Sequence, residues 1–189
     1  MSQIAPTIAL PEGADNYLTT IEHQVTMVAA ALGEVDRGAQ LLAELDSDFE
    51  NAAAEHPQFA GKTVTVGAFS GSGYGAYVAA NSRVVFMRKL GFVQNPVVDA
   101  LPAKGFSVPV SAEELNTLDA DLVLVFPIEK SPADVTVDPL FQAIPAVRDG
   151  RAVVFDDPAV AKSYSANSIL SAQFALDTVV PLAAERLQG

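Results

Sequence analysis

The sequence predicts an α/β fold, namely a three-layer α/β/α lobe with a mostly parallel sheet, preceded by a long helical connector. The run Leu122-Val-Leu-Val-Phe126 is apolar at every position, which is typical of a strand covered on both faces. Strand and helix patterns alternate after residue 62, as they do in α/β lobes. Before that point lie two amphipathic helical patterns, at residues 17–32 and 35–55.

The elements follow in order along the chain. Gly33 ends the first helical pattern, and Pro57 and Gly61 end the second. Ser111-Ala-Glu-Glu114 matches a capping box, which predicts a helix start. We expect strands at residues 63–69, 97–98 together with 108–110, 121–126 and 152–155, and further helices at 82–90, 111–118, 139–143 and 168–187.

Composition excludes several classes of function. The chain has 189 residues, 50 % of them apolar, and a net charge of −12 that disfavours nucleic acid and anionic membranes as partners. It contains no cysteine, so disulfides and thiolate chemistry are excluded, and only two histidines, so we expect no protein-built metal site. No apolar run has the length of about 20 residues that a membrane span needs.

A glycine-rich aromatic segment, Gly67 to Tyr77, follows the first expected strand and is predicted to be a ligand loop. One interpretation is a phosphate cradle: Gly71-Ser-Gly-Tyr-Gly-Ala76 fits a dinucleotide-binding pattern, with Asp99 as the acid that binds ribose. Bulky aromatic residues in the loop and a helix that begins only at Ser82 disfavour this interpretation. The two other interpretations of this segment are a plain surface loop and a loop whose aromatic side chains bind a ligand.

Nucleophilic catalysis has little support. No histidine follows the loop, so a Ser-His-acid triad cannot form in the α/β-hydrolase order. Adjacent acids such as Asp156 and Asp157 are more often solvated turn residues than an acid–base pair. We therefore expect no catalytic residues.

Three loops that follow strands are expected to converge at one edge of the sheet. They are the segments 67–81, 127–130 and 155–168. These segments carry three tyrosines together with Phe69 and Lys130, and Arg83 lies just after the first of them. Aromatic faces with one or two cations suit a large, flat ligand that is anionic or rich in π-electrons. Ser165 or Asn167 can alternatively cap the last helix.

The order of motifs resembles a known family, the class III substrate-binding proteins of ABC importers, which bind ferric siderophores, haem and cobalamin between two lobes. Each motif is weakly specific, but together they follow the family order over most of the chain. They are Ile4-Ala-Pro-Thr-Ile-Ala-Leu10, the helical segments from Tyr17 to Phe49, Phe59-Ala-Gly-Lys-Thr-Val64, Leu90-Gly-Phe92, Val110-Ser-Ala-Glu-Glu-Leu115, Leu118-Asp-Ala-Asp-Leu-Val-Leu-Val125, Pro139-Leu-Phe141, Ile144-Pro-Ala-Val-Arg-Asp-Gly-Arg-Ala-Val-Val154 and Ser168-Ile-Leu-Ser to Leu176-Asp.

The resemblance implies residue roles. The acids Glu113 and Glu114 correspond to the place where the family docks onto its permease, although a capping box explains them as well. No cofactor is expected, because iron would arrive inside its chelator. The residues implied to bind the ligand are Tyr74, Tyr77, Asn81, Arg83, Phe126, Tyr164, Ser165 and Asn167.

The resemblance also implies a domain organisation. Residues 1–13 would be a remnant of an N-terminal lobe, 14–57 the interlobe helical connector and 58–189 the C-terminal α/β lobe. The opening Met1-Ser-Gln-Ile-Ala-Pro6 contains no signal peptide and reads as the interior of a longer protein, so we expect a truncated chain.

The expected function is the ligand-binding lobe of an extracytoplasmic protein, lipid-anchored in its full-length form, that delivers a ferric siderophore to an ABC importer permease. The expected ligand is a small-molecule metal chelate, and its chemical class stays open. The alternatives are a small Rossmann-like nucleotide-binding enzyme that uses the loop from Gly71 to Gly75, and a pure interaction module.

Overall fold

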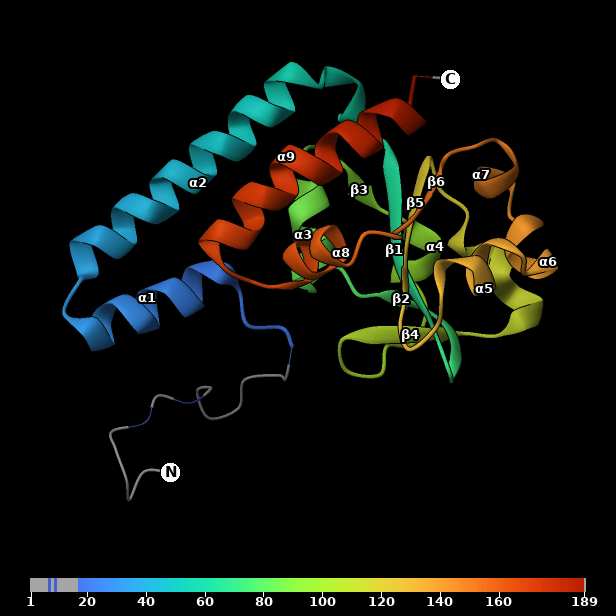
Figure 1. Ribbon diagram of the computed structural model, residues 1–189, viewed down its shortest axis with the longest axis horizontal. Helices are drawn as coiled ribbons and strands as arrows, with labels where there is room; N and C mark the ends of the chain where they lie inside the picture. The colour runs from blue at the N-terminus through green and yellow to red at the C-terminus, as the bar shows by residue number, and fades with distance from the viewer. Residues whose placement is uncertain (1–6, 8, 10–16, 189) are drawn as a thin grey trace.

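The computed structural model describes residues 7, 9 and 17–188. The expected remnant of an N-terminal lobe, residues 1–13, lies outside the described residues apart from Thr7 and Ala9. The described chain begins with two helices and continues into a sheet with helices on both faces (Figure 1).

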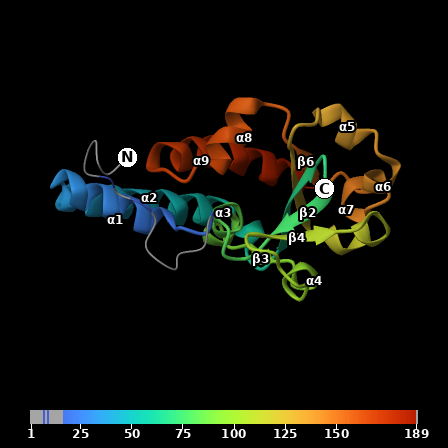
Figure 2. The ribbon, with the colours of Figure 1, turned by 90° about the horizontal axis from the view of Figure 1, so that it is seen from below.

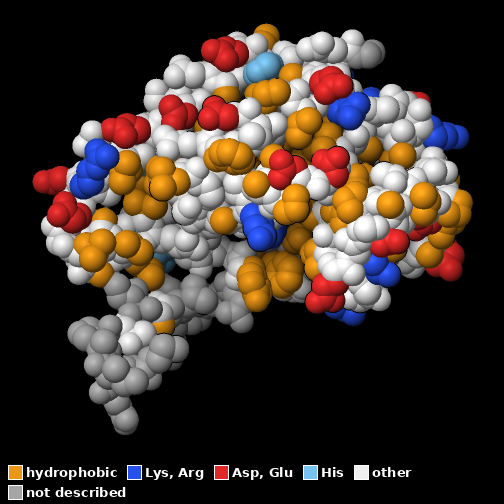
Figure 3. Space-filling model, viewed as in Figure 1, with side chains coloured by type: hydrophobic (Ala, Val, Ile, Leu, Met, Phe, Trp, Pro, Cys, Tyr) orange, Lys and Arg blue, Asp and Glu red, His pale blue; other side chains and the backbone are white. Residues whose placement is uncertain are grey.

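The first two helices form an antiparallel pair that extends from one side of the sheet (Figures 1 and 2). Helix α1 covers Ile21–Leu32 and α2 covers Val35–Glu55, as the sequence predicts. The two helices approach closely at Gly38, where an added Cβ would lie 2.5 Å from the Cβ of Ala29. Acidic side chains follow the outer side of α2 (Figure 3).

The sheet is mostly parallel. Strand β1 covers Thr63–Ser70 and pairs in parallel with β5, Leu122–Pro127, which pairs in parallel with β6, Ala152–Val154. On the other side, β1 pairs antiparallel with β2, Gly73–Tyr77, and β2 pairs antiparallel with β4, Ser107–Val110. The short strand β3, Val93–Gln94, pairs in parallel with the start of β1. The fold class expected from the sequence is confirmed.

Helices cover both faces of the sheet (Figure 1). The alternation along β5 shows why that strand is apolar throughout: Leu122, Leu124 and Phe126 face the core beneath α2, α3 and α9, whereas Val123 and Val125 face the opposite core. The remaining helical segments are η1 (Pro57–Phe59), α3 (Ser82–Lys89), α4 (Pro96–Asp99), η2 (Ala112–Leu118), α5 (Pro132–Thr136), α6 (Pro139–Gln142), α7 (Pro145–Arg148), α8 (Pro158–Ser165) and α9 (Ile169–Arg186).

Three local predictions were wrong. Residues 97–98 belong to helix α4 instead of a strand, because the side chain of Asn95 accepts a hydrogen bond from Val97 N at 2.9 Å and Pro96 occupies the first turn. Segment 111–118 is a 3₁₀ helix, and Ser111 Oγ donates to the Glu114 carboxylate instead of capping a backbone amide. The expected loop 155–168 contains helix α8, which Asp157 caps.

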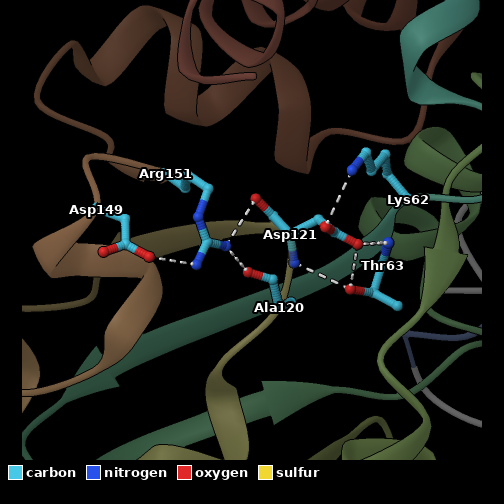
Figure 4. Close-up of polar contacts among 6 residues, drawn as sticks. All are labelled: Lys62, Thr63, Ala120, Asp121, Asp149 and Arg151. Carbon is cyan, nitrogen blue, oxygen red and sulfur yellow. Dashed lines mark hydrogen bonds and ion pairs between the residues drawn. The ribbon is translucent and has the colours of Figure 1, made fainter. Parts of the chain in front are cut away.

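The amino ends of β1 and β5 are joined by a polar clamp (Figure 4). Thr63 N and Thr63 Oγ1 donate to Asp121 Oδ2 at 2.8 and 2.9 Å, and Asp121 N donates to Thr63 Oγ1 at 2.9 Å. Lys62 Nζ lies 3.3 Å from Asp121 Oδ1, and Arg151 donates to the backbone carbonyl groups of Ala120 and Asp121. These bonds set the register at which the two parallel strands begin.

The clamp also affects the ionisation of Asp121. Partial burial raises the pKa of its carboxyl, but the Thr63 amide, the Thr63 hydroxyl and the Lys62 ammonium together hold the pKa below the ordinary value of 3.8. A carboxylate with a depressed pKa stabilises the fold above its unfolded-state pKa, and this contribution is lost as the pH falls through the folded-state pKa.

No helix among the described residues combines the length and the apolar content that crossing a membrane requires.

We predict that Asp121→Asn lowers the free energy of unfolding at neutral pH by about 1–2 kcal/mol, because charge-assisted hydrogen bonds become neutral ones. The difference from the unsubstituted protein should shrink as the pH falls below the ordinary value of 3.8, and it should be lost once the pH has passed the lower folded-state pKa of Asp121. Urea denaturation at neutral and acidic pH measures both effects. Asp156→Asn, at an exposed aspartate, serves as the control and should change neither the free energy of unfolding nor its dependence on pH. Equal loss at every pH would contradict the role of the charge.

Candidate functional site

The glycine-rich segment is a β-hairpin and not a loop. Strands β1 and β2 pair from Gly67 with Ala76 to Ser70 with Gly73, so only two residues turn the chain. A Cβ at Gly67 would lie 2.8 Å from the carbonyl oxygen of Gly75, which explains a glycine at that position. Because Gly71 to Gly75 lie in the turn and in β2, and no helix starts there, the segment lacks the geometry of a phosphate cradle. The Rossmann-like interpretation is therefore not favoured.

The hairpin separates two of the tyrosines. Tyr74 and Tyr77 are three residues apart on β2, so their side chains lie on opposite faces of the sheet. Tyr74 is buried against Phe69, with 4.2 Å between ring centroids, and its hydroxyl donates to Asp138 Oδ2 at 2.9 Å. Burial, and then the Asp138 carboxylate, raise the pKa of Tyr74. Lys130 Nζ lies 5.6 Å from the Phe69 ring centroid.

The prediction that three tyrosines, Phe69, Arg83 and Lys130 line one shared aromatic shelf is therefore wrong. Tyr74, Phe69 and Lys130 belong to the face of the sheet that carries α5 and α6. The physical reason is the pleat of β2, which directs residues an odd number of positions apart to opposite faces.

Six of the predicted site residues do come together, with Arg83 at the centre. Asn81 caps helix α3, its Oδ1 accepting from Arg83 N at 3.1 Å. The guanidinium carbon of Arg83 lies 4.6 Å from the ring centroid of Tyr77 and 5.4 Å from that of Phe126. Arg83 Nε donates to Ser165 Oγ at 3.2 Å, and Nη1 lies 3.4 Å from Asn81 Oδ1. The side chain is thus held by two rings and two polar groups.

Tyr164 holds the backbone of the same residue. Its hydroxyl donates to the carbonyl oxygen of Arg83 at 2.6 Å, and its ring stacks on Phe126 with centroids 5.5 Å apart. Burial raises the pKa of Tyr164 well above its ordinary value. Burial also raises the pKa of Tyr77, and the Arg83 cation opposes that shift. Because both rings are buried, they support Arg83 and present little surface to a ligand.

An open cleft lies directly above this cluster. It has a volume of about 690 Å³ and brings together residues 17–24 at the start of α1, the amino end of α3 and the junction between α8 and α9. Asn167 Nδ2 donates to the carbonyl oxygen of Thr19 at 2.7 Å and ties the segment before α1 to that junction. Among the residues that the structure describes, the lining consists of Tyr17, Thr19, Gln24, Ser82, Arg83, Ser165 and Asn167, and of these Arg83 alone is charged.

The sequence analysis did not identify Tyr17, an exposed aromatic residue in the lining of the cleft. Tyr17 is 73 % exposed, its φ of 66° is unusual for a bulky side chain, and its ring lies 4.9 Å from that of Phe106. In the sequence, Tyr17 was interpreted only as the start of a helical pattern. No sequence signal links it to Ser82 and Arg83, which lie more than fifty residues further along the chain.

The two acids with an expected docking role differ in their contacts. Both are exposed in η2, directly after β4. Glu114 Oε2 accepts a hydrogen bond from Ser111 Oγ at 3.1 Å. Glu113 forms no hydrogen bond or ion pair with any described residue, so its carboxylate is available to solvent.

Within residues 7, 9 and 17–188, no group of three or more His, Cys, Asp or Glu residues is arranged to hold a metal ion.

Comparison with known proteins identifies the family to which the chain belongs. The family described as periplasmic binding protein matches residues 1–159. The Fe(3+)-citrate-binding protein YfmC of Bacillus subtilis is 26 % identical over 153 residues, which are 80 % of this chain and 47 % of that protein. The chain thus spans about half the length of this curated relative.

Solved structures show the same fold at low sequence identity. A periplasmic solute binding protein from Mycobacterium smegmatis superposes with a TM-score of 0.79 at 22 % identity, covering 98 % of this chain and 63 % of that one. PiaA of Streptococcus pneumoniae in complex with ferrichrome gives 0.76 at 21 % identity, covering 91 % and 60 %. From the family match over most of its length and the shared fold, this chain belongs to the periplasmic binding protein family.

Proposed function

We propose that this chain is the C-terminal, ligand-binding part of an extracytoplasmic protein that captures a ferric chelate and passes it to an ABC importer. The observation that carries the proposal is the cleft above Arg83, which is wide, lined by hydroxyl and amide groups, and flanked by the exposed ring of Tyr17. Support comes from the curated relative, which by name binds Fe(3+)-citrate, and from the PiaA structure, which holds ferrichrome.

The proposed mechanism is binding without turnover. Ser165 and Asn167 offer hydrogen-bonding groups in the lining of the cleft, and the Tyr17 ring offers an aromatic face to the ligand. Iron would come with its chelator, so we propose no protein ligand to the metal and no resident cofactor. The cleft is open to solvent, and we propose that a second lobe of the longer protein closes over it. The connector, residues 14–57, would join the two lobes, and a lipid anchor would hold the whole protein at the membrane.

The first test is chelate binding by the chain itself. The chain contains four tyrosines and no tryptophan, so quenching of tyrosine fluorescence reports binding. We expect ferric citrate or ferrichrome to quench the emission saturably. Asn167→Ala should weaken binding about fivefold, because a net hydrogen bond is worth about 1 kcal/mol and the connector is released from the α8–α9 junction.

Tyr74→Phe is the matched control for this experiment. Its ring lies on the other face of the sheet, so the affinity should stay unchanged. Failure of both ferric chelates to bind would refute the proposal. A stabilisation of several degrees by NAD in thermal melting would favour the nucleotide-binding alternative instead.

A second test addresses delivery to the permease. In the longer protein, we expect Glu113→Arg to leave chelate affinity unchanged and to reduce iron uptake by about tenfold or more, because the substitution reverses a charge that is free to pair with a permease cation. Radioactive iron uptake by cells measures this. Glu50→Arg, at an exposed acid on α2, controls for net charge and should have no effect. Normal uptake with Glu113→Arg would remove the docking role.

A further inference from the structure

We propose that Lys89, which lies outside the lining of the cleft, is a positioning residue for ligand binding. It acts through Glu22 on helix α1, and thereby keeps Tyr17 and Thr19 in place at the cleft. Glu22 lies between Thr19 and Gln24 in the chain, and both of these residues line the cleft. The inference rests on the proposed function, because it concerns how the same cleft keeps its shape.

Lys89 lies in the last turn of α3 and joins three helices. Its Nζ is 3.0 Å from Glu22 Oε1 on α1 and 2.7 Å from Asp46 Oδ1 on α2. The same atom lies 5.4 Å from the ring centroid of Phe49, and the Lys89 side chain is only 26 % exposed. Burial alone would lower the pKa of Lys89, but its hydrogen bonds to Asp46 and Glu22 raise the pKa above the ordinary value of 10.5. The ammonium group is therefore charged at neutral pH and attracts both carboxylates.

Apolar packing holds the beginning of α1 only weakly. Within α1, which the structure describes in full, Ala29 is the only fully buried residue, and it lies near the other end of the helix. A cavity of about 50 Å³ separates the first turn of α1 from α2 and α3, and its lining includes Ile21, Phe49 and Phe86. Side chains that border a void lose the dispersion contacts that would otherwise fix them. The position of the first turn therefore depends on polar contacts.

The segment that leads into α1 has an unfavourable local conformation. Tyr17 has a φ of 66°, and Thr19 Oγ1 is buried without a hydrogen-bond partner among the described residues. Such a conformation is kept only where the surrounding contacts hold it. Asn167 Nδ2 donates to the carbonyl oxygen of Thr19, and Lys89 holds Glu22 three residues later. Loss of the Lys89 contact should therefore let this segment move away from the cleft.

The two carboxylates that contact Lys89 offer a matched comparison. Glu22 belongs to the first turn of α1, whereas Asp46 belongs to α2, which contributes no residue to the described lining of the cleft. Both side chains are partly exposed, so neutralising either should affect global stability to a similar, small extent. Only neutralisation of Glu22 releases α1 from Lys89.

The test measures the affinity of the chain for ferric citrate and for ferrichrome by tyrosine fluorescence. We expect Glu22→Gln and Lys89→Met to weaken binding by about threefold, because the ligand must then order the released segment. Asp46→Asn should leave both affinities unchanged within about 1.5-fold, as it leaves the contact between Lys89 and Glu22 intact. Lys89→Arg should restore binding, because its guanidinium can still pair with Glu22.

Amide hydrogen exchange tests the same role without a ligand. We expect the backbone amides in the first half of α1 to exchange about threefold faster in Glu22→Gln and Lys89→Met than in the unsubstituted chain. Asp46→Asn should leave these rates unchanged, and the amides of α9 should keep their rates in every variant. Circular dichroism confirms that each variant is folded. If Lys89→Met is not folded, Glu22→Gln, at a side chain that is 44 % exposed, carries the test.

The outcomes separate the inference from the proposed function. Equal weakening by Glu22→Gln and Asp46→Asn would overturn the inference, because Lys89 would then act through overall stability. Unchanged affinity in Glu22→Gln and Lys89→Met, or unchanged exchange in α1, would also overturn it and leave the proposed function standing. Failure of the unsubstituted chain to bind either chelate would overturn both.

Discussion

Two hydrophobic cores share β5 as a common wall, and the rest of the structure depends on the burial of this strand on both faces. Leu122, Leu124 and Phe126 enter one core, and Val123 and Val125 enter the other. Each such side chain contributes about 1.5–3 kcal/mol when fully buried, so a shift of register by one residue would exchange the two sets and misfit both cores. The clamp of Thr63, Asp121 and Arg151 sets the start of the same strands with polar contacts.

This constraint also places the candidate site. Phe126 is the last residue of β5 that faces the first core, and its ring lies beneath the guanidinium of Arg83, which lines the cleft. Tyr77 from β2 and Tyr164 from α8 pack around that ring, and together they hold Arg83. The cation therefore rests on the edge of a hydrophobic core. A hydrated surface arginine would adopt many rotamers, whereas this one is restricted to a single orientation by packing on one side and hydrogen bonds at its end.

Much of the fold could be predicted from the sequence because its signals are local. The spacing of apolar residues predicted α1 and α2 and the wholly apolar pattern predicted β5, and the structure confirms these elements. The prediction of a ligand loop at residues 67–77 was wrong because the residue types there are ambiguous. Glycine and tyrosine occur in loops, and they also suit a hairpin in which two backbones approach closely. Six of the side chains predicted for the site do come together. The prediction assumed a loop, so it could not foresee the burial of the aromatic side chains or the position of Tyr74 on the other face of the sheet.

The sequence by itself determined the fold class, the family resemblance, the absence of cysteine chemistry and the acidic character of the chain, because each of these depends on composition or on the period of a pattern. Only the tertiary structure decided that Tyr17, Arg83 and Asn167 border one cleft and that Lys130 does not. These residues come from three segments far apart in the chain, and their meeting depends on how helices α1, α3, α8 and α9 pack on one face of the sheet. Such packing is the sum of many weak, non-local contacts, which no short stretch of sequence encodes.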